Sequence, residues 1–221
     1  RKILEKIQRI VISYQAKFDL IFADIIKELQ KEKIYLIDEK SLQPSQVDYL
    51  RLYFKKHIST HLAPIMLKGL EHFPELVDQS IYLAVKLSFK KNKDVKEYSL
   101  IEIPTRLISR FILLPKKDDK HYIILLDDVI RLCLDEVFSI FPYDHFEAYT
   151  IKITRDAEID VDNDISESLL EKISKGVKNR KKGEPVRFVY DSKIPAEMFE
   201  FLTKAMDLDE DDFGIPGGRY H

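Results

Sequence analysis

The first 33 residues carry an amphipathic helix pattern, and this segment limits what the chain can fold into more than any other. Apolar side chains recur there every three or four residues, as on one face of an α-helix. They are Ile3, Ile7, Ile10, Tyr14, Phe18, Ile21, Ile25 and Leu29, with Ile12, Leu20, Phe22 and Ile26 widening the stripe beyond a coiled-coil seam. At a rise of ~1.5 Å per residue such a helix spans about 50 Å. We expect an arm that packs against other helices, some of which precede residue 1.

After this segment the pattern alternates between helical and strand periods. A short strand is expected at 34–37, and a helix from Pro44 that Pro64 ends. Further strands are expected at 80–89, 97–103, 110–114 and 122–126, the last almost continuously apolar and therefore predicted to be central and buried on both faces. Helices are expected from 127 to near Pro142 and from Pro195. The predicted fold class is α+β, a long N-terminal helical arm followed by a mixed-sheet α/β head domain.

The stretch from Tyr149 to Asp191 predicts a β-α-β unit with a polar loop. Ile151 and Ile153 alternate with polar residues, as in a half-buried strand. Asp164 stands at a helix N-cap position, and an apolar stripe follows it. Gly183 and Pro185 are expected to end that helix before the next strand.

The composition favours an ordinary globular protein and excludes few functions. The chain has 36 basic and 38 acidic residues among 221, so its net charge forces neither nucleic acid nor a membrane as partner. Its one cysteine, Cys133, excludes an internal disulfide and suits a reducing compartment. Apolar neighbours indicate a buried, inert thiol. No apolar run approaches the length of a membrane span. The chain starts without methionine inside a helix pattern, so we expect a fragment of a longer protein.

Two metal-site patterns are weaker than they first look. Asp160, Asp162, Asp164 and Glu171 match positions 1, 3, 5 and 12 of a calcium loop, but Ile165 stands where that loop needs glycine. A negative helix N-terminus is the favoured interpretation. His57 and His61 share a helix face, but Ile58 replaces the glutamate of a zincin motif and no third ligand is evident. Two ordinary histidines are therefore favoured.

A basic cluster leaves two interpretations open. It consists of Lys175, Lys178, Arg180, Lys181 and Lys182. Such charges at a helix C-terminus complement the helix dipole and improve solubility. They are also a candidate contact for a polyanion, although the absence of aromatic residues among them disfavours single-stranded nucleic acid.

No active-site signature is present in the chain. There is no P-loop, no glycine-rich dinucleotide turn, no Cys-x-x-Cys and no nucleophile elbow. The residues themselves therefore predict no catalytic, cofactor-binding or metal-binding position.

Several strings nevertheless resemble a known family. Residues 151–158, 184–190, 194–195 and 216–221 read IKITRDAE, EPVRFVY, IP and PGGRYH, and they resemble the middle part of bacterial polyphosphate kinases. Tyr82–Val85, Ile101–Pro104, Arg110-Phe111 and Ile124–Asp127 continue the resemblance in the same order. It covers essentially the whole chain.

The resemblance implies a domain division and an activity for the parent enzyme. Residues 1–33 would be the last helix of an N-terminal helical domain, 34–215 the head domain, and 216–221 the start of a linker to catalytic domains. In this family the γ-phosphate of ATP passes to a histidine and then to polyphosphate, with magnesium, in two C-terminal domains. The implied parent is a homodimeric cytoplasmic kinase, with membrane association an open point, and nucleic acid is not among its partners.

The resemblance also implies that this fragment is inactive. The family's phosphohistidine, the arginines and magnesium site around it, and its adenine-contacting asparagine all match positions outside this chain. None of the six histidines is therefore assigned as the phosphorylated residue, and ATP and Mg²⁺ are expected for the parent enzyme only. The alternative hypothesis is a stand-alone polyanion-binding or protein-interaction module, motivated by residues 175–182.

Overall fold

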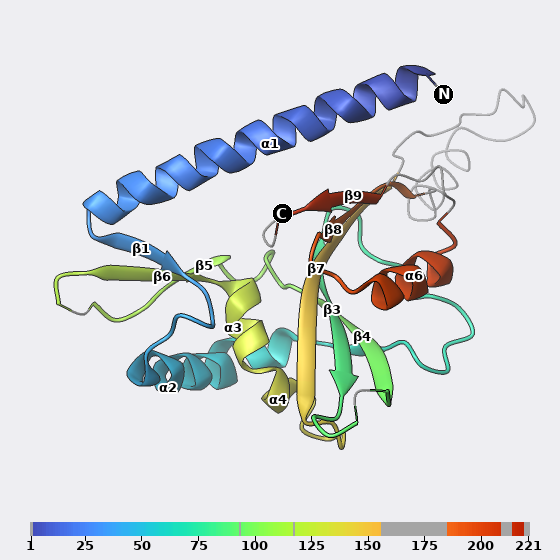
Figure 1. Cartoon of the computed structure of the whole chain (residues 1–221). Helices are drawn as coiled ribbons and strands as arrows, with labels where there is room; N and C mark the ends of the chain where they lie inside the picture. The colour runs from blue at the N-terminus through green and yellow to red at the C-terminus, as the bar shows by residue number, and fades with distance from the viewer. Residues whose placement is uncertain (1, 93, 117, 156–184, 209–213, 219–221) are drawn as a thin grey trace, which may run out of the picture. The chain divides into compact units, whose positions relative to one another are not determined.

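The expected N-terminal helix is present as α1 (Lys2–Lys31). The computed structural model describes residues 2–92, 94–116, 118–155, 185–208 and 214–218. Figure 1 shows α1 as one long helix that leads into β1 (Ile34–Ile37). Large apolar side chains remain exposed along α1, among them Phe18 at 62% and Leu20 at 69%. No helix in the described part of the chain is long and apolar enough to cross a membrane.

A three-stranded sheet follows the arm, in the order β1-β6-β5. β1 pairs in parallel with β6 (His121–Leu125), and β5 (Phe111–Leu113) pairs antiparallel with the other side of β6. The central position predicted for this strand is confirmed. Its predicted burial on both faces is wrong for the first part of the range 122–126, since Tyr122 and Ile123 are only half-buried, whereas Ile124, Leu125 and Leu126 are buried. Neighbouring strands pair with the edges of a strand and do not cover its faces, and the buried residues Ile124 and Leu125 are those that lead directly into the buried start of α3.

The second sheet has six strands in the order β2-β4-β3-β7-β8-β9. Three of its strands lie close to their predicted positions, namely β3 (Ile81–Ser88), β4 (Lys96–Glu102) and β7 (His145–Arg155). The chain divides into two compact units, and β3 and β7 each belong to both. Unit 1 holds residues 1–66 and 85–148, and unit 2 holds residues 67–84 and 149–221. In unit 1 the short β2 (Ile65–Met66) pairs antiparallel with β4.

The second helix of unit 1 changes its hydrogen-bond pattern along its length. α2 (Pro44–Tyr53) begins with proline at its first position, where a missing N–H costs nothing. The backbone N–H of Gln43 donates to the buried Gln46 side chain at 2.9 Å. The helix continues as a π-helical segment, η1 (Phe54–Ile58), and a 3₁₀ turn, η2 (Ser59–His61). Phe54 and Ile58, both almost fully buried, therefore anchor this end in the core.

The helix predicted after residue 127 is two helices, α3 (Leu126–Leu132) and α4 (Leu134–Val137). They are separated at Cys133, whose φ of −109° and ψ of 19° are not helical. Leu126, Val129 and Ile130 are fully buried and form part of the unit 1 core. The break turns the chain so that Phe138, also 0% exposed, enters the same core.

In unit 2 the stretch from Tyr149 to Asp191 differs from a parallel β-α-β crossover. β7 and β8 (Pro185–Asp191) are adjacent and antiparallel, with Ile151 opposite Tyr190 and Ile153 opposite Phe188. The helix expected between them lies outside the described residues. The final helix is confirmed as α6 (Ala196–Ala205), with Met198 and Leu202 buried.

The glycine- and proline-rich end of the chain contains a strand that the sequence did not predict. β9 (Gly214–Gly217) pairs in parallel with β8 and completes the sheet. A Cβ atom at Gly214 would lie 3.1 Å from the Tyr190 ring and 3.4 Å from that of Phe199. Tyr190 and Phe199 are themselves in contact, with ring centroids 4.5 Å apart. Glycine therefore lets β9 approach the aromatic side chains of β8 and α6.

Candidate functional site

The residues singled out in the sequence as a polyanion contact lie outside the described part of the chain. They are Lys175, Lys178, Arg180, Lys181 and Lys182, all within residues 156–184. The calcium-like positions Asp160, Asp162, Asp164 and Glu171 fall in the same segment. Both interpretations of the basic cluster therefore stay predictions.

The described histidines are dispersed. The ring of His57 lies against that of Tyr53, with centroids 4.7 Å apart. His61 is in the 3₁₀ turn that follows, and His121 begins β6. Among the residues that the structure describes, no three His, Cys, Asp or Glu side chains come close enough to hold a metal ion.

Two carboxylates buried at the start of α3 are each paired with an arginine. Asp127 and Asp128 are both 0% exposed. The guanidinium of Arg110 lies 3.1 Å from Asp127, and that of Arg131 donates to Asp128 at 2.9 Å. A buried carboxylate without a cation would be costly, so these arginines permit the burial. The two arginine–aspartate pairs therefore stabilise the packing of α3.

A third arginine joins α2 to α4. Arg51 lies 3.1 Å from Asp135 and 2.8 Å from Glu136. Hydrogen bonds to Asp135 and then Glu136 raise the pKa of Arg51 further above its ordinary value, so its charge is permanent. Arg51 thereby fixes the positions of the Asp135 and Glu136 carboxylates and joins the two helices.

One lysine, one glutamate and one histidine lie together on neighbouring strands of unit 1. Lys86 on β3 is 9% exposed, and its Nζ lies 3.9 Å from Oε1 of Glu147 on β7. The same carboxylate oxygen lies 3.4 Å from Nε2 of His145. A carboxylate at this distance can orient an imidazole ring, and Glu147 is placed to do so for His145.

The thiol of Cys133 is buried and protonated. Burial raises the pKa of Cys133 to about 12, with a smaller contribution from the negative charge of Glu136. Thiolates are the reactive form, so at pH 8 we expect native Cys133 to react with iodoacetamide on the order of a thousandfold more slowly than in the urea-unfolded chain. Mass spectrometry of the alkylated protein over time measures both rates. Equal rates would contradict the burial of this thiol.

The same shift predicts a stability change at alkaline pH. The unfolded thiol loses its proton at about pH 8.5, whereas the native one keeps it until about 12, so the unfolded state binds fewer protons between these values. The contribution of Cys133 to stability is complete below pH 8.5 and declines as pH rises toward 12. The difference in unfolding free energy between the native chain and Cys133→Ala should therefore shrink over this range.

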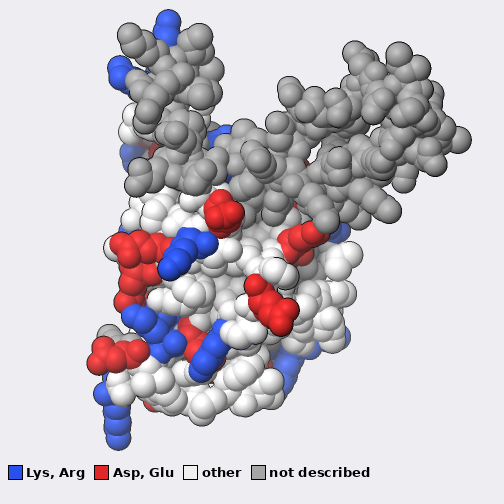
Figure 2. Space-filling model, turned by 90° about the vertical axis from the view of Figure 1, so that its right-hand side faces the viewer, with Lys and Arg blue, Asp and Glu red and all other residues white. Residues whose placement is uncertain are grey.

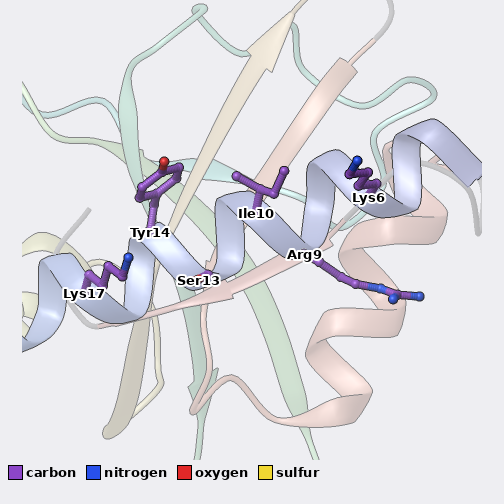
Figure 3. Close-up of a pocket in the computed structure, with 6 residues that line it drawn as sticks. All are labelled: Lys6, Arg9, Ile10, Ser13, Tyr14 and Lys17. Atoms are coloured by element: carbon purple, nitrogen blue, oxygen red, sulfur yellow. The ribbon is translucent and has the colours of Figure 1, made fainter.

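A basic surface runs along the first half of α1. Lys6, Arg9, Ser13 and Lys17, here called the basic strip, line an open hollow of about 330 Å³ together with Ile10 and Tyr14. All six side chains are exposed. Figure 3 shows Ile10 and Tyr14 pointing to the same side of the helix, while Arg9 extends to the other side. At about 100° per residue the six residues cover an arc of roughly 140°.

The face drawn in Figure 2 carries charges of both signs. Basic and acidic side chains are interspersed there, with uncharged surface between them. The basic strip differs because Lys6, Arg9 and Lys17 all lie within one arc of a single helix.

Comparison with known proteins identifies the family. Residues 45–221 match the family model described as "Polyphosphate kinase middle domain". The chain belongs to the polyphosphate kinase family. It is 39% identical over 225 residues to a polyphosphate kinase of Vibrio parahaemolyticus and 37% identical over 227 residues to one of Escherichia coli. In both comparisons all of this chain is covered, but only 32% of the relative.

A solved structure is also similar. The crystal structure of polyphosphate kinase from Porphyromonas gingivalis matches 99% of this chain with a TM-score of 0.80 and 29% sequence identity, and the match covers 31% of that protein. The mixed α/β fold and the long N-terminal helix agree with this similarity, which confirms the predicted fold class. The chain thus spans about a third of the length of the polyphosphate kinases it matches.

The sequence itself contains a signal for the basic strip. Lys6, Ser13 and Lys17 lie at positions i, i+7 and i+11, and Arg9 lies at i+3, so they share a helix face. This polar periodicity overlaps the apolar stripe of the same helix, which is longer and more regular.

Proposed function

We propose that this chain is the middle-domain scaffold of a polyphosphate kinase and performs no phosphoryl transfer by itself. The parent enzyme would transfer the γ-phosphate of ATP to polyphosphate through a phosphohistidine contributed by other domains. The observation that carries the proposal is the match of residues 45–221 to the middle domain of this family, within a chain that spans about a third of its relatives.

The side chains described above are consistent with a scaffold. Phosphoryl transfer depends on metal ions and cations arranged around the phosphates. In the family that this chain belongs to, we assign these groups to the other domains of the parent enzyme. The arginines of the α3 region are occupied by buried or neighbouring carboxylates, as in Arg110–Asp127 and Arg131–Asp128. ATP and Mg²⁺ are assigned to the parent enzyme, which we propose to be a homodimer.

Incubation of the chain with ATP labelled in the γ-phosphate, Mg²⁺ and a polyphosphate primer tests the proposal. We expect no label in the protein and no extension of the primer. A matched reaction with a complete polyphosphate kinase of the family shows that the conditions support transfer.

Labelling of the chain itself would contradict the proposal. His145 would then be the first position to replace, because Glu147 lies 3.4 Å from its Nε2. Loss of an acid-labile label in His145→Gln would place a phosphohistidine within this chain and overturn the scaffold assignment.

A further inference from the structure

The end of α1 is a sharp turn built on a residue in the left-handed conformation. Lys33 has a φ of +61°, in the region that side chains other than glycine rarely adopt. The backbone N–H of Lys33 donates to the carbonyl of Gln30 at 3.1 Å, a short-range bond that tightens the last turn of the helix. Because Ile34 begins β1 immediately afterwards, the backbone of Lys33 sets the angle between α1 and β1.

The loop before β6 holds this turn from the side. Ile34 and His121 begin β1 and β6 and lie opposite each other in a parallel pair, so this loop comes next to the end of α1 (Figure 1). The backbone N–H of His121 donates to the carbonyl of Lys33 at 2.9 Å. Nζ of Lys33 lies 2.8 Å from Oδ2 of Asp119, whose Oδ1 lies 2.6 Å from Nζ of Lys116. This backbone hydrogen bond and the Lys33–Asp119 ion pair are here called the loop clamp.

The ion pairs in the second half of α1 act within the helix. Lys27 lies 3.0 Å from Asp24 and Lys31 lies 2.6 Å from Glu28, each about one turn away. Large apolar side chains such as Phe18 are exposed. Neither set of side chains anchors α1 to the β1-β6-β5 sheet, so the direction of the helix depends mainly on the residues at its end.

The turn and the loop clamp are close to balance. A residue other than glycine in the left-handed conformation costs free energy, because its Cβ atom approaches a backbone carbonyl oxygen. This cost is comparable with the net stabilisation that one hydrogen bond provides. The ion pair adds little, since the side chains of Lys33 and Asp119 are both more than half exposed. A residue that tolerates the left-handed conformation less well than lysine should therefore release the turn.

We propose that Lys33 and the loop clamp form a conformational stop that holds α1 in one direction relative to the β1-β6-β5 sheet. With Lys33 in the left-handed conformation, the chain leaves the helix and enters β1 in register with β6. With Lys33 in the right-handed region, the chain would turn by about 100° more around the helix axis before β1 begins. The stop therefore determines how α1 projects from the sheet, a role that does not rest on the proposed function.

The distance between two spin labels measures the direction of α1 in the 221-residue chain. Labels are attached at two exposed positions, Ser13→Cys on α1 and Thr60→Cys in η2, and pulsed electron paramagnetic resonance records their distance distribution. Cys133 stays unlabelled because it is buried. We expect one narrow distribution with Lys33 in place. For Lys33→Val we expect a second maximum or at least twice the width, because a β-branched residue strongly disfavours a positive φ.

The matched control is Lys33→Gly. Both substitutions remove the ion pair with Asp119, but glycine adopts the left-handed conformation readily. We expect Lys33→Gly to keep the native maximum. Asp119→Asn tests the ion pair alone, since asparagine tolerates the φ of +60° at this position, and it should broaden the distribution less than Lys33→Val. Labels at Thr60→Cys and Ile140→Cys, both outside α1, should give the same distance in every variant.

Three results would overturn the inference. The first is a native distribution as broad as that of Lys33→Val, and the second is equal broadening in Lys33→Val and Lys33→Gly. The third is a changed distance between the labels at positions 60 and 140 in Lys33→Val, which would mean that Lys33 acts on the fold of unit 1 rather than on the direction of α1. Labelling of the chain by ATP would overturn the scaffold role without bearing on this turn.

Discussion

Replacing Arg131 with leucine should lower the free energy of unfolding by about 3–5 kcal/mol, because it leaves a buried carboxylate without its cation. Arg131 donates to Asp128 at 2.9 Å, and the two side chains are 6% and 0% exposed. Its Nε also donates to the backbone carbonyl of Ala148 at 3.4 Å. Leucine supplies neither hydrogen bond nor charge. Urea unfolding followed by circular dichroism measures the loss.

A pair with the same sequence spacing provides the control. Lys27 and Asp24 also lie three residues apart, but their side chains are 70% and 73% exposed. Lys27→Leu should therefore change stability by no more than about 0.5 kcal/mol. The double variant Arg131→Leu, Asp128→Leu should recover much of the loss, since no charge remains buried. If Arg131→Leu and Lys27→Leu lower the free energy of unfolding by the same amount, the prediction that burial makes the Arg131–Asp128 pair important for stability is wrong.

Phe138→Ala should destabilise the chain by a similar amount, about 3–5 kcal/mol, through a cavity in the unit 1 core. Phe138 is 0% exposed, and its ring lies 5.8 Å from that of Phe146 and 6.2 Å from that of Phe141, measured between centroids. Truncation removes both ring contacts as well as buried apolar area. The midpoint of urea unfolding should move to a lower concentration with an unchanged slope.

Ile140 is the matched control for this substitution. It lies two residues away and is 86% exposed. Ile140→Ala should therefore change the free energy of unfolding by no more than about 0.5 kcal/mol. A loss at Ile140 as large as that at Phe138 would mean that the chain turn after α4 places a different side chain in the core.

The candidate surfaces were predictable to different degrees. The basic cluster at 175–182 was evident in the sequence because its residues are close together in the chain, but it lies outside the described residues. The cations of the basic strip are spread over twelve positions, and only the helix brings Lys6, Arg9 and Lys17 onto one face. His145 and Glu147 are two residues apart on β7, but the approach of Lys86 to Glu147 could not be predicted, because it depends on which strands are neighbours.

Local patterns determined much of the secondary structure. The apolar periods placed α1, β1, β3, β4 and α6 to within a few residues, because each element buries one face and its sequence records which side chains face inward. Proline at residue 44 fixed the start of α2, since its ring favours the first helical position. The order of family-specific strings was sufficient to indicate the polyphosphate kinase family.

Only the tertiary structure decided which residues are partners. Arg51 pairs with Asp135 across 84 positions of the chain, and Arg110 pairs with Asp127 across 17. A periodic pattern shows that a side chain is buried, but it does not show what lies opposite. The strand β9 was missed for the same reason, because Gly214 is needed for its contact with Tyr190 and Phe199 rather than for a local preference. Periodicity is a property of neighbouring residues, whereas pairing arises only when distant segments come together.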